Sequence, residues 1–159
     1  MNDLQEKQET SKVDDVLLRK TLSSSMTAGK VDNYISERAK LLVPIDAVLD
    51  FKLFGFDGKL KCHPTDTKKY PYKWEHRVYG AGLIDVDNCK GTLSTGYTSW
   101  DKLWADTTSA GVTAGEAALG VVLVVFFRKD GTPIGDFRGM PSGKLGLGGA
   151  GGDGGWEKI

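Results

Sequence analysis

The spacing of apolar residues along the chain changes near Pro44. Before it, residues 27–42 repeat apolar side chains at intervals of three and four, the spacing of a helix with one buried stripe: Val31, Tyr34, Ile35 and Leu41 or Leu42. We therefore expect a short amphipathic helix that Pro44 ends. Residues 1–26 are mostly polar, so we interpret them as a flexible or partly helical segment ahead of a domain over residues 27–159.

After Pro44, apolar and polar residues alternate, which is typical of strands. The alternation predicts strands over residues 47–55, from residue 59, over 76–87 and over 89–98. In the first strand, Lys52 and Phe54 fall in one phase, opposite the mainly apolar phase. Asp57–Gly58 and Asp87–Asn88 are typical turn residues, and we expect them to join successive strands in a meander.

Further strands are predicted in the C-terminal half. They cover residues 109–118, 119–128, 132–138 and a glycine-rich last strand within 144–156. A short helical turn is expected between Trp100 and Trp104. Trp100, Leu103 and Trp104 are interpreted as a hydrophobic plug over one end of the fold.

These elements predict an all-β fold, a compact antiparallel eight-stranded β-barrel with one short amphipathic helix and a flexible N-terminal segment. The chain has 21 glycines among 159 residues, concentrated after Gly80. This favours a barrel over a sandwich, because glycine permits sharp bends and close approach of strands. We expect its centre to be filled with side chains rather than hollow.

Charge and composition exclude several classes of partner. The 21 Lys and Arg residues balance the 21 Asp and Glu residues, so we expect no nucleic-acid partner, which would need a basic surface. The longest apolar run, residues 117–127, is shorter than the roughly 20 residues of a membrane-spanning helix, and we expect no such helix. The first twenty residues show no pattern of a secretory signal peptide.

No motif of a known reaction is present, so no catalytic residue is assigned. The two cysteines, Cys62 and Cys89, suit one disulfide or two reduced thiols. With His63 and His76 they form no pair at the spacing of zinc ligands, and we expect neither a metal nor a cofactor. Three segments partly match nucleotide-binding or calcium-binding motifs: residues 85–88, 146–151 and 148–153. Each lacks the surrounding sequence that such binding requires. We interpret residues 85–88 as a polar turn, and the two glycine-rich segments as part of a closing strand.

The segment Lys68–Gly80 alternates aromatic and basic residues. Such a surface can bind by stacking and cation–π contacts. The candidate binding residues are Tyr70, Tyr72, Trp74, Arg77 and Tyr79. The alternative is an edge strand that Pro71 protects from pairing with other chains.

Several strings, in this order, resemble the C-terminal domain of the virulence-associated (Vap) proteins of actinobacterial pathogens. They span about two-thirds of the chain: FKLFGFDGKL (51–60), GAG (80–82), GTLSTGYTSWDKLWADT (91–107), VVLVVFFRKDGTPIGDF (121–137) and GLGGAGGDGGW (146–156). The resemblance implies an eight-stranded antiparallel barrel secreted into the host phagosome, without an established active site. The chain departs from the family in lacking a signal peptide and in its charged, helix-forming N-terminal segment.

The leading hypothesis is therefore a non-enzymatic Vap-like protein, monomeric, that binds a host protein or membrane surface during intracellular survival. One alternative is a lipocalin-like carrier of a small molecule, which an interior cavity would reveal. Another is a protein-interaction or immunity-type protein of the cytoplasm. The resemblance implies secretion, whereas the missing signal peptide favours the cytoplasm.

Overall fold

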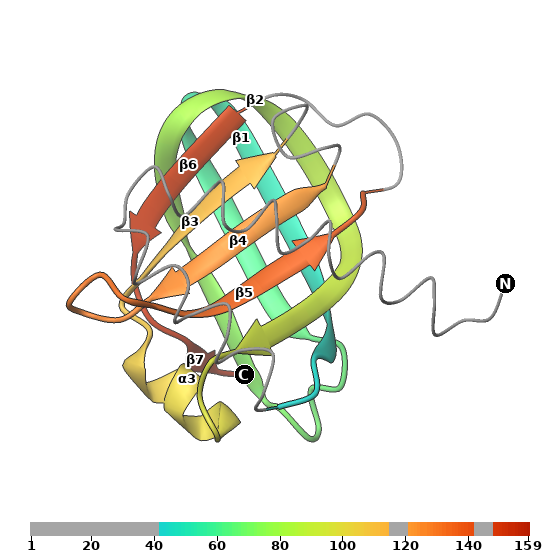
Figure 1. The fold of residues 1–159 in the computed structure, drawn as a ribbon. Helices are drawn as coiled ribbons and strands as arrows, with labels where there is room; N and C mark the ends of the chain where they lie inside the picture. Colours follow the sequence, from blue (N-terminus) through green and yellow to red (C-terminus); the bar gives the residue numbers. More distant parts are fainter. Residues whose placement is uncertain (1–41, 115–120, 142–147) are drawn as a thin grey trace, which may run out of the picture.

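The computed structural model describes residues 42–114, 121–141 and 148–159 (Figure 1). The segment 1–26 and almost all of the helix predicted over residues 27–42 lie outside these ranges. The elements are β1 (Ile45–Pro64), β2 (Tyr72–Thr95), α3 (Trp100–Asp106), β3 (Ser109–Ala114), β4 (Val122–Phe127), β5 (Pro133–Gly139), β6 (Gly148–Asp153) and β7 (Glu157–Lys158).

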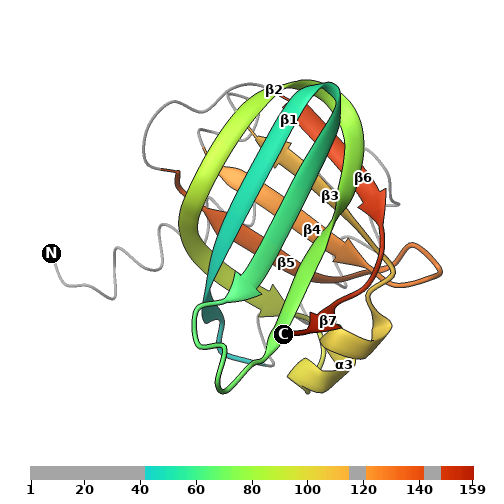
Figure 2. The same cartoon turned by 180° about the vertical axis from the view of Figure 1, so that it is seen from behind.

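The two longest strands, β1 and β2, are paired along their length and bend over together at one end of the molecule (Figures 1 and 2). Gly55, whose φ is 75°, and Gly82, with φ of 143°, face each other at this bend. The bend brings the halves of β1 side by side, and the Thr65 N–H donates to the Asp46 carbonyl at 2.9 Å. The predicted turn at Asp57–Gly58 is therefore wrong, because β1 runs through it as one strand, and the chain reverses instead in a bend at Gly55.

The predicted turn at Asp87–Asn88 is wrong, because β2 runs through it as one strand. Here the register with β1 shifts between Leu49 and Phe51, so that two residues of β2 lie opposite Asp50. Asn88 adopts a φ of 54°, and its N–H donates to the Asp50 carboxylate at 2.8 Å. This is a β-bulge, which uses the same residue types as a turn, and it replaces the expected meander.

The sheet closes on itself through β2. Its second half pairs with β5, its first half pairs with β6, and β3 and β4 complete the ring in the order β5–β4–β3–β6, with every pair antiparallel. β1 and β2 contribute two segments each and β3 to β6 one each, which accounts for the eight predicted strands. The all-β, antiparallel fold class with a short helix is confirmed.

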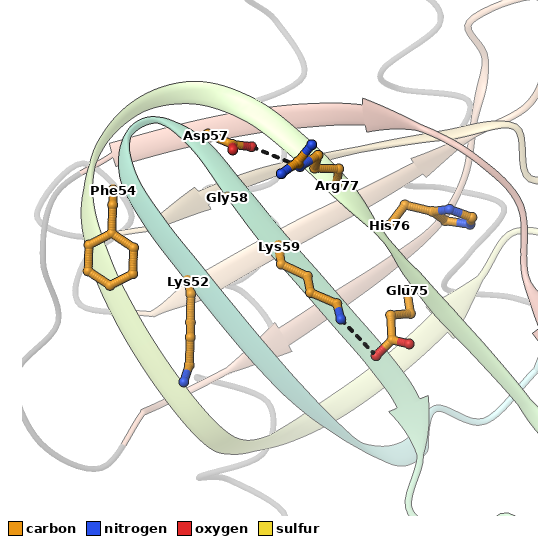
Figure 3. Close-up of a pocket in the computed structure, with 8 residues that line it drawn as sticks. All are labelled: Lys52, Phe54, Asp57, Gly58, Lys59, Glu75, His76 and Arg77. Carbon is orange, nitrogen blue, oxygen red and sulfur yellow. Dashed lines mark ion pairs between the residues drawn. The ribbon is translucent and has the colours of Figure 1, made fainter.

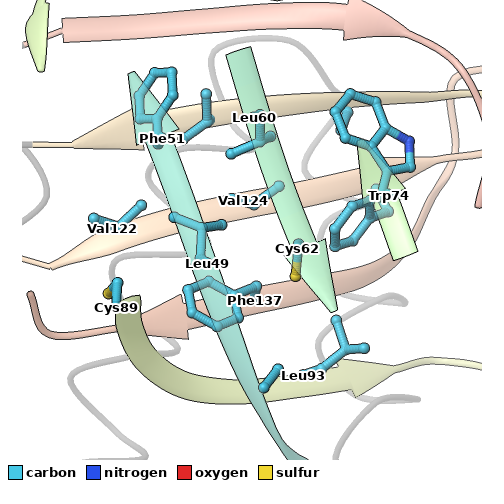
Figure 4. Packing of buried hydrophobic residues seen from close by; sticks show 14 of the residues in the cluster. Leu49, Phe51, Leu60, Cys62, Trp74, Cys89, Leu93, Val122, Val124 and Phe137 are labelled. Carbon is cyan, nitrogen blue, oxygen red and sulfur yellow. The ribbon is translucent and has the colours of Figure 1, made fainter. Parts of the chain in front are cut away.

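Inward-pointing side chains fill the centre of this ring (Figure 4). The largest fully buried ones are Trp74, Phe51, Phe126, Phe137, Leu49, Leu53, Leu60, Ile84, Leu93 and Leu103. Glycines let strands approach closely around them: a Cβ on Gly80 would lie 1.9 Å from the Gly149 carbonyl oxygen, and one on Gly91 would lie 2.0 Å from that of Arg138. Within the described residues, this packed centre does not favour the carrier alternative.

The helix α3 covers the end of the ring opposite the bend (Figure 2). Ser99 caps it by accepting a hydrogen bond from the Asp101 N–H at 3.2 Å. Leu103 and Trp104 are buried, and the Trp104 ring lies edge-on to Trp156 with centroids 4.7 Å apart. The interpretation of this segment as a hydrophobic plug is therefore confirmed.

Candidate functional site

The five residues predicted as a binding surface lie on both faces of β2 and in the preceding loop. Trp74 points into the core, where it is fully buried. Its Nε1–H donates to the Gly154 carbonyl at 3.0 Å, and its ring meets Phe126 edge-on at 6.2 Å. The expectation that Trp74 is exposed is wrong, because strand alternation places it in phase with buried Val78.

Tyr70 and Tyr72 are half-buried against α3. The Tyr72 ring stacks on Trp104 with centroids 5.3 Å apart, and Tyr70 meets Trp100 edge-on at 6.0 Å. Their rings extend the plug and leave only part of each side chain for contact with a partner.

Arg77 and Tyr79 do lie on the outside of the ring. Tyr79 is 60% exposed, and the Arg77 guanidinium lies 3.3 Å from the Asp57 carboxylate. This part of β2 is not an edge, because β1 pairs with one side of β2, and β6 and β7 pair with the other. The edge-strand alternative is therefore wrong as well.

Exposed apolar side chains gather at the bend of β1 and β2. Phe54, Phe56, Tyr79 and Leu83 are 62%, 81%, 60% and 68% exposed, and Phe54 lies directly opposite Leu83 in the register. We call these four residues the apolar tip. The sequence held a signal for it, since Phe54 shares its phase with the outward-facing Lys52.

A groove of about 700 Å³ runs from the apolar tip along the outer face of β1 and β2, and its lining residues are drawn in Figure 3. Phe54 belongs both to the tip and to the wall of the groove. The lining residues are Lys52, Phe54, Asp57, Gly58, Lys59, Glu75, His76 and Arg77.

Charged side chains of both signs alternate in this groove. Arg77 pairs with Asp57 at 3.3 Å and Lys59 with Glu75 at 3.8 Å. Lys52 reaches outward to β2, where its Nζ lies 3.6 Å from the Asp87 carboxylate. The groove therefore presents neither a purely basic nor a purely acidic surface.

Glu75 lies among three lysines. Its carboxylate is 3.3 Å from Lys73 Nζ, 3.8 Å from Lys59 Nζ and 3.9 Å from Lys61 Nζ. Partial burial raises the pKa of Glu75, but the hydrogen bond from Lys73 and the charges of Lys59 and Lys61 outweigh it, so the pKa lies below its ordinary value.

The two cysteines and two histidines weighed as metal ligands do not form a metal site among the described residues. Cys62 and Cys89 are free, buried thiols, so a disulfide between them is not formed. Burial, with the nearby charge of Asp50, raises the pKa of Cys89 to about 11, and burial also raises that of Cys62. His76 Nε2 lies 2.7 Å from the Gly155 carbonyl oxygen, held beside Trp74. Among the described residues, no group of three or more His, Cys, Asp or Glu side chains could hold a metal ion.

The glycine-rich segments 146–151 and 148–153, which partly match nucleotide-binding and calcium-binding motifs, lie partly in β6. Residues 148–153 form this strand between β2 and β3, as the closing-strand interpretation predicted, and residues 142–147 lie outside the described ranges. Asp85 and Asp87 both lie within ion-pair distance of Lys52.

Comparison with solved structures finds this fold in proteins of the intracellular pathogen Rhodococcus equi. The virulence-associated protein VapB is 19% identical, with a TM-score of 0.60 over 74% of this chain and 98% of VapB. VapD, another virulence-associated protein, is 22% identical, with a TM-score of 0.54 over 72% of this chain and 97% of VapD. The chain has the Vap fold.

At 19% and 22% sequence identity, the similarity to VapB and VapD shows a shared fold. The resemblance to the Vap family that the sequence indicated is confirmed for the fold. Comparisons with models of protein families and with curated protein sequences find no match. None of the helices in the described ranges has the length and apolar character needed to cross a bilayer.

Proposed function

We propose that this chain is a non-enzymatic, Vap-like virulence-associated protein that acts by docking its apolar tip on a host membrane surface. The observation that carries the proposal is the apolar tip itself. Four large apolar side chains, 60% to 81% exposed, gather at one bend, whereas single exposed apolar residues are ordinary on protein surfaces. A group of this kind keeps apolar area in water unless a partner covers it.

A membrane suits this surface better than a protein partner does. The tip lies on the outside of a bend, at the end of the molecule opposite α3 (Figure 2). Insertion into the bilayer interface needs projecting apolar and aromatic side chains, which settle at the headgroup level, but no matching shape on the other side. Binding of a protein would instead need close packing of both partners around buried anchors.

The position of the open groove on the surface, and not in the interior, favours action by binding over catalysis. Core side chains fill the centre of the ring, and the groove beside the tip lies on its outer face. The groove carries ion pairs at the surface, which suit contact with a ligand or a membrane. The names of VapB and VapD, both described as virulence-associated proteins of an intracellular pathogen, support a role at the host and hence secretion.

Sedimentation with lipid vesicles tests the proposal. We expect the wild-type protein to pellet with phosphatidylcholine vesicles, and the double variant Phe54→Ser/Phe56→Ser to bind at least tenfold more weakly. Burying one such side chain is worth about 1.5–3 kcal/mol, and tenfold corresponds to about 1.4 kcal/mol.

Ile159→Ser is the matched control, because Ile159 is 61% exposed but lies at the opposite end, where its N–H donates to the Pro71 carbonyl. We expect this variant to bind as the wild type does. Absence of wild-type binding, or equal binding of the double variant, overturns the membrane proposal and leaves a host protein as the partner to seek with the same tip variants.

A further inference from the structure

We propose that the groove beneath the apolar tip receives a zwitterionic phospholipid headgroup, one that carries a phosphate and an ammonium group as phosphocholine does. The inference rests on the proposed function and names the lipid class that the same surface selects. It is carried by the position of the groove, the signs of its charges and the aromatic ring in its wall.

The position follows from Phe54, which belongs to both tip and groove (Figure 3). Lys52 lies two residues from Phe54 on the same face, a distance of about 7 Å at roughly 3.3 Å per residue. The headgroup layer on each side of a bilayer is about 5–8 Å thick. With the tip at the level of the headgroups, Phe54 and Lys52 therefore both fit within the depth of this layer.

The charges of the groove match a ligand that carries both signs. Lys59 and Arg77 can contact a phosphate, while Glu75 and Asp57, 3.8 and 3.3 Å from these cations, can contact an ammonium group. A purely anionic headgroup would meet both carboxylates, and a purely cationic one would meet both cations. Only a zwitterion finds an opposite charge for each of its groups.

Exchange of partners in the groove costs little. The Lys59 side chain is 67% exposed, and those of Arg77 and Asp57 are 69% and 55% exposed. Ion pairs this exposed contribute little net stability, because water and salt screen them. A headgroup can therefore replace the exposed Arg77–Asp57 pair with pairs of its own at little cost to the fold. Glu75, whose side chain is 26% exposed, keeps Lys61 and Lys73 as partners when Lys59 turns to a ligand.

The ring of Phe54 adds a feature that suits a quaternary ammonium. It is 62% exposed and lies in the wall of the groove, within the same lining as Asp57 and Glu75. A quaternary ammonium is attracted to the face of an aromatic ring, and a carboxylate nearby adds a favourable charge. The arrangement favours choline over a bare primary ammonium.

Vesicles of defined composition provide the first test. We expect wild-type protein to bind phosphatidylcholine vesicles at least fivefold more tightly than phosphatidylglycerol vesicles of equal size and salt. The double variant Asp57→Asn/Glu75→Gln leaves the cations in place, and we expect it to reverse this preference. Lys102→Ala, which removes an exposed cation of α3 outside the groove, is the control and should keep it.

Titration of the soluble protein with phosphocholine, followed by nuclear magnetic resonance, locates the contact. We expect the amide signals of Lys59, Glu75 and Arg77 to shift with phosphocholine, and to shift at least threefold less with glycerol phosphate or with choline. Equal shifts with glycerol phosphate, or none with phosphocholine, overturn the inference.

Failure of this inference differs from failure of the proposed function. If wild-type protein binds both kinds of vesicle equally, and Phe54→Ser/Phe56→Ser abolishes binding to both, the tip docks on membranes but the groove selects no headgroup. If the wild type binds no vesicle, the proposed function itself fails, and this inference fails with it.

Discussion

At the residue scale, one alternation decides which side chains of β2 reach a partner. Tyr72, Trp74 and Val78 point toward the core or the plug, while Arg77 and Tyr79 point to solvent. From its composition alone, the whole segment 68–80 is predicted to form a binding surface. Strand phase divides it, because successive side chains of a strand point to opposite faces.

This division predicts very different effects on stability of two alanine substitutions in one strand. Trp74→Ala removes a fully buried indole together with its hydrogen bond to the Gly154 carbonyl, and we expect a loss of about 3–5 kcal/mol in the free energy of unfolding. Tyr79→Ala removes a ring that is 60% exposed, and a change within about 0.5 kcal/mol is expected. Urea unfolding measures both, and similar losses would contradict the assigned strand phase.

The carboxylate of Glu75 predicts a pH dependence of stability. Its pKa in the folded protein lies below the ordinary value of 4.5, so Glu75 stabilises the fold fully above that value, and this contribution is lost as pH falls through the folded pKa. Glu75→Gln should therefore lower stability near neutral pH, and its difference from wild type should shrink as the pH falls below 4.5 through the lower folded pKa. Thermal unfolding across this range measures the effect, and a pH-independent difference would assign it to lost packing instead.

At the scale of elements, glycines and one asparagine bend long strands that the sequence pattern divides into shorter ones. The sequence pattern places turns at 57–58 and 87–88, but the first reversal is a bend at Gly55 and the second site is a bulge, and both lie within continuous strands. Bulges and turns both need residues that tolerate a positive φ. Only the partner strand decides between them, because it continues the hydrogen-bond ladder or ends it.

Close approach of strands predicts that two glycines respond differently to alanine. In Gly80→Ala the new Cβ would lie 1.9 Å from the Gly149 carbonyl oxygen, so β2 and β6 must move apart, and we expect a loss of about 1–3 kcal/mol or more. In Gly111→Ala the nearest atom is the Phe127 ring at 3.8 Å, an ordinary contact, and a change below about 1 kcal/mol is expected. Chemical unfolding of the two variants decides, and equal stability would contradict the tight pairing of β2 with β6.

At the scale of the whole molecule, β2 joins all parts of the sheet. It pairs with β1, β5, β6 and β7, and its two halves hold the two ends of the series β5–β4–β3–β6, so the closure of the ring depends on this strand. The same core cluster receives side chains from β1 to β5, from α3 and from Trp156. Stability is therefore shared around the ring instead of divided between independent parts.

This sharing predicts one cooperative unfolding transition. The four tryptophans, Trp74, Trp100, Trp104 and Trp156, lie at or near the end that α3 covers, so their fluorescence reports on that end. Far-ultraviolet circular dichroism reports on the whole sheet. We expect the two signals to change at the same denaturant concentration, as for a two-state domain. Two separate midpoints would mean that the plug and the ring unfold independently.

The amino-acid sequence by itself determined the all-β class, the approximate number of strands, the short helix at residues 100–104 and the buried character of β4. These properties follow from local periodicity, turn residues and apolar runs. The tertiary structure decided how the strands close and that Trp74 enters the core. It also decided that Phe54, Phe56, Tyr79 and Leu83 all lie exposed near one bend beside a groove of mixed charge. Residues 54–56 and 79–83 come together only because β1 and β2 bend in register, and the pairing of distant segments is not encoded in the local pattern of either one.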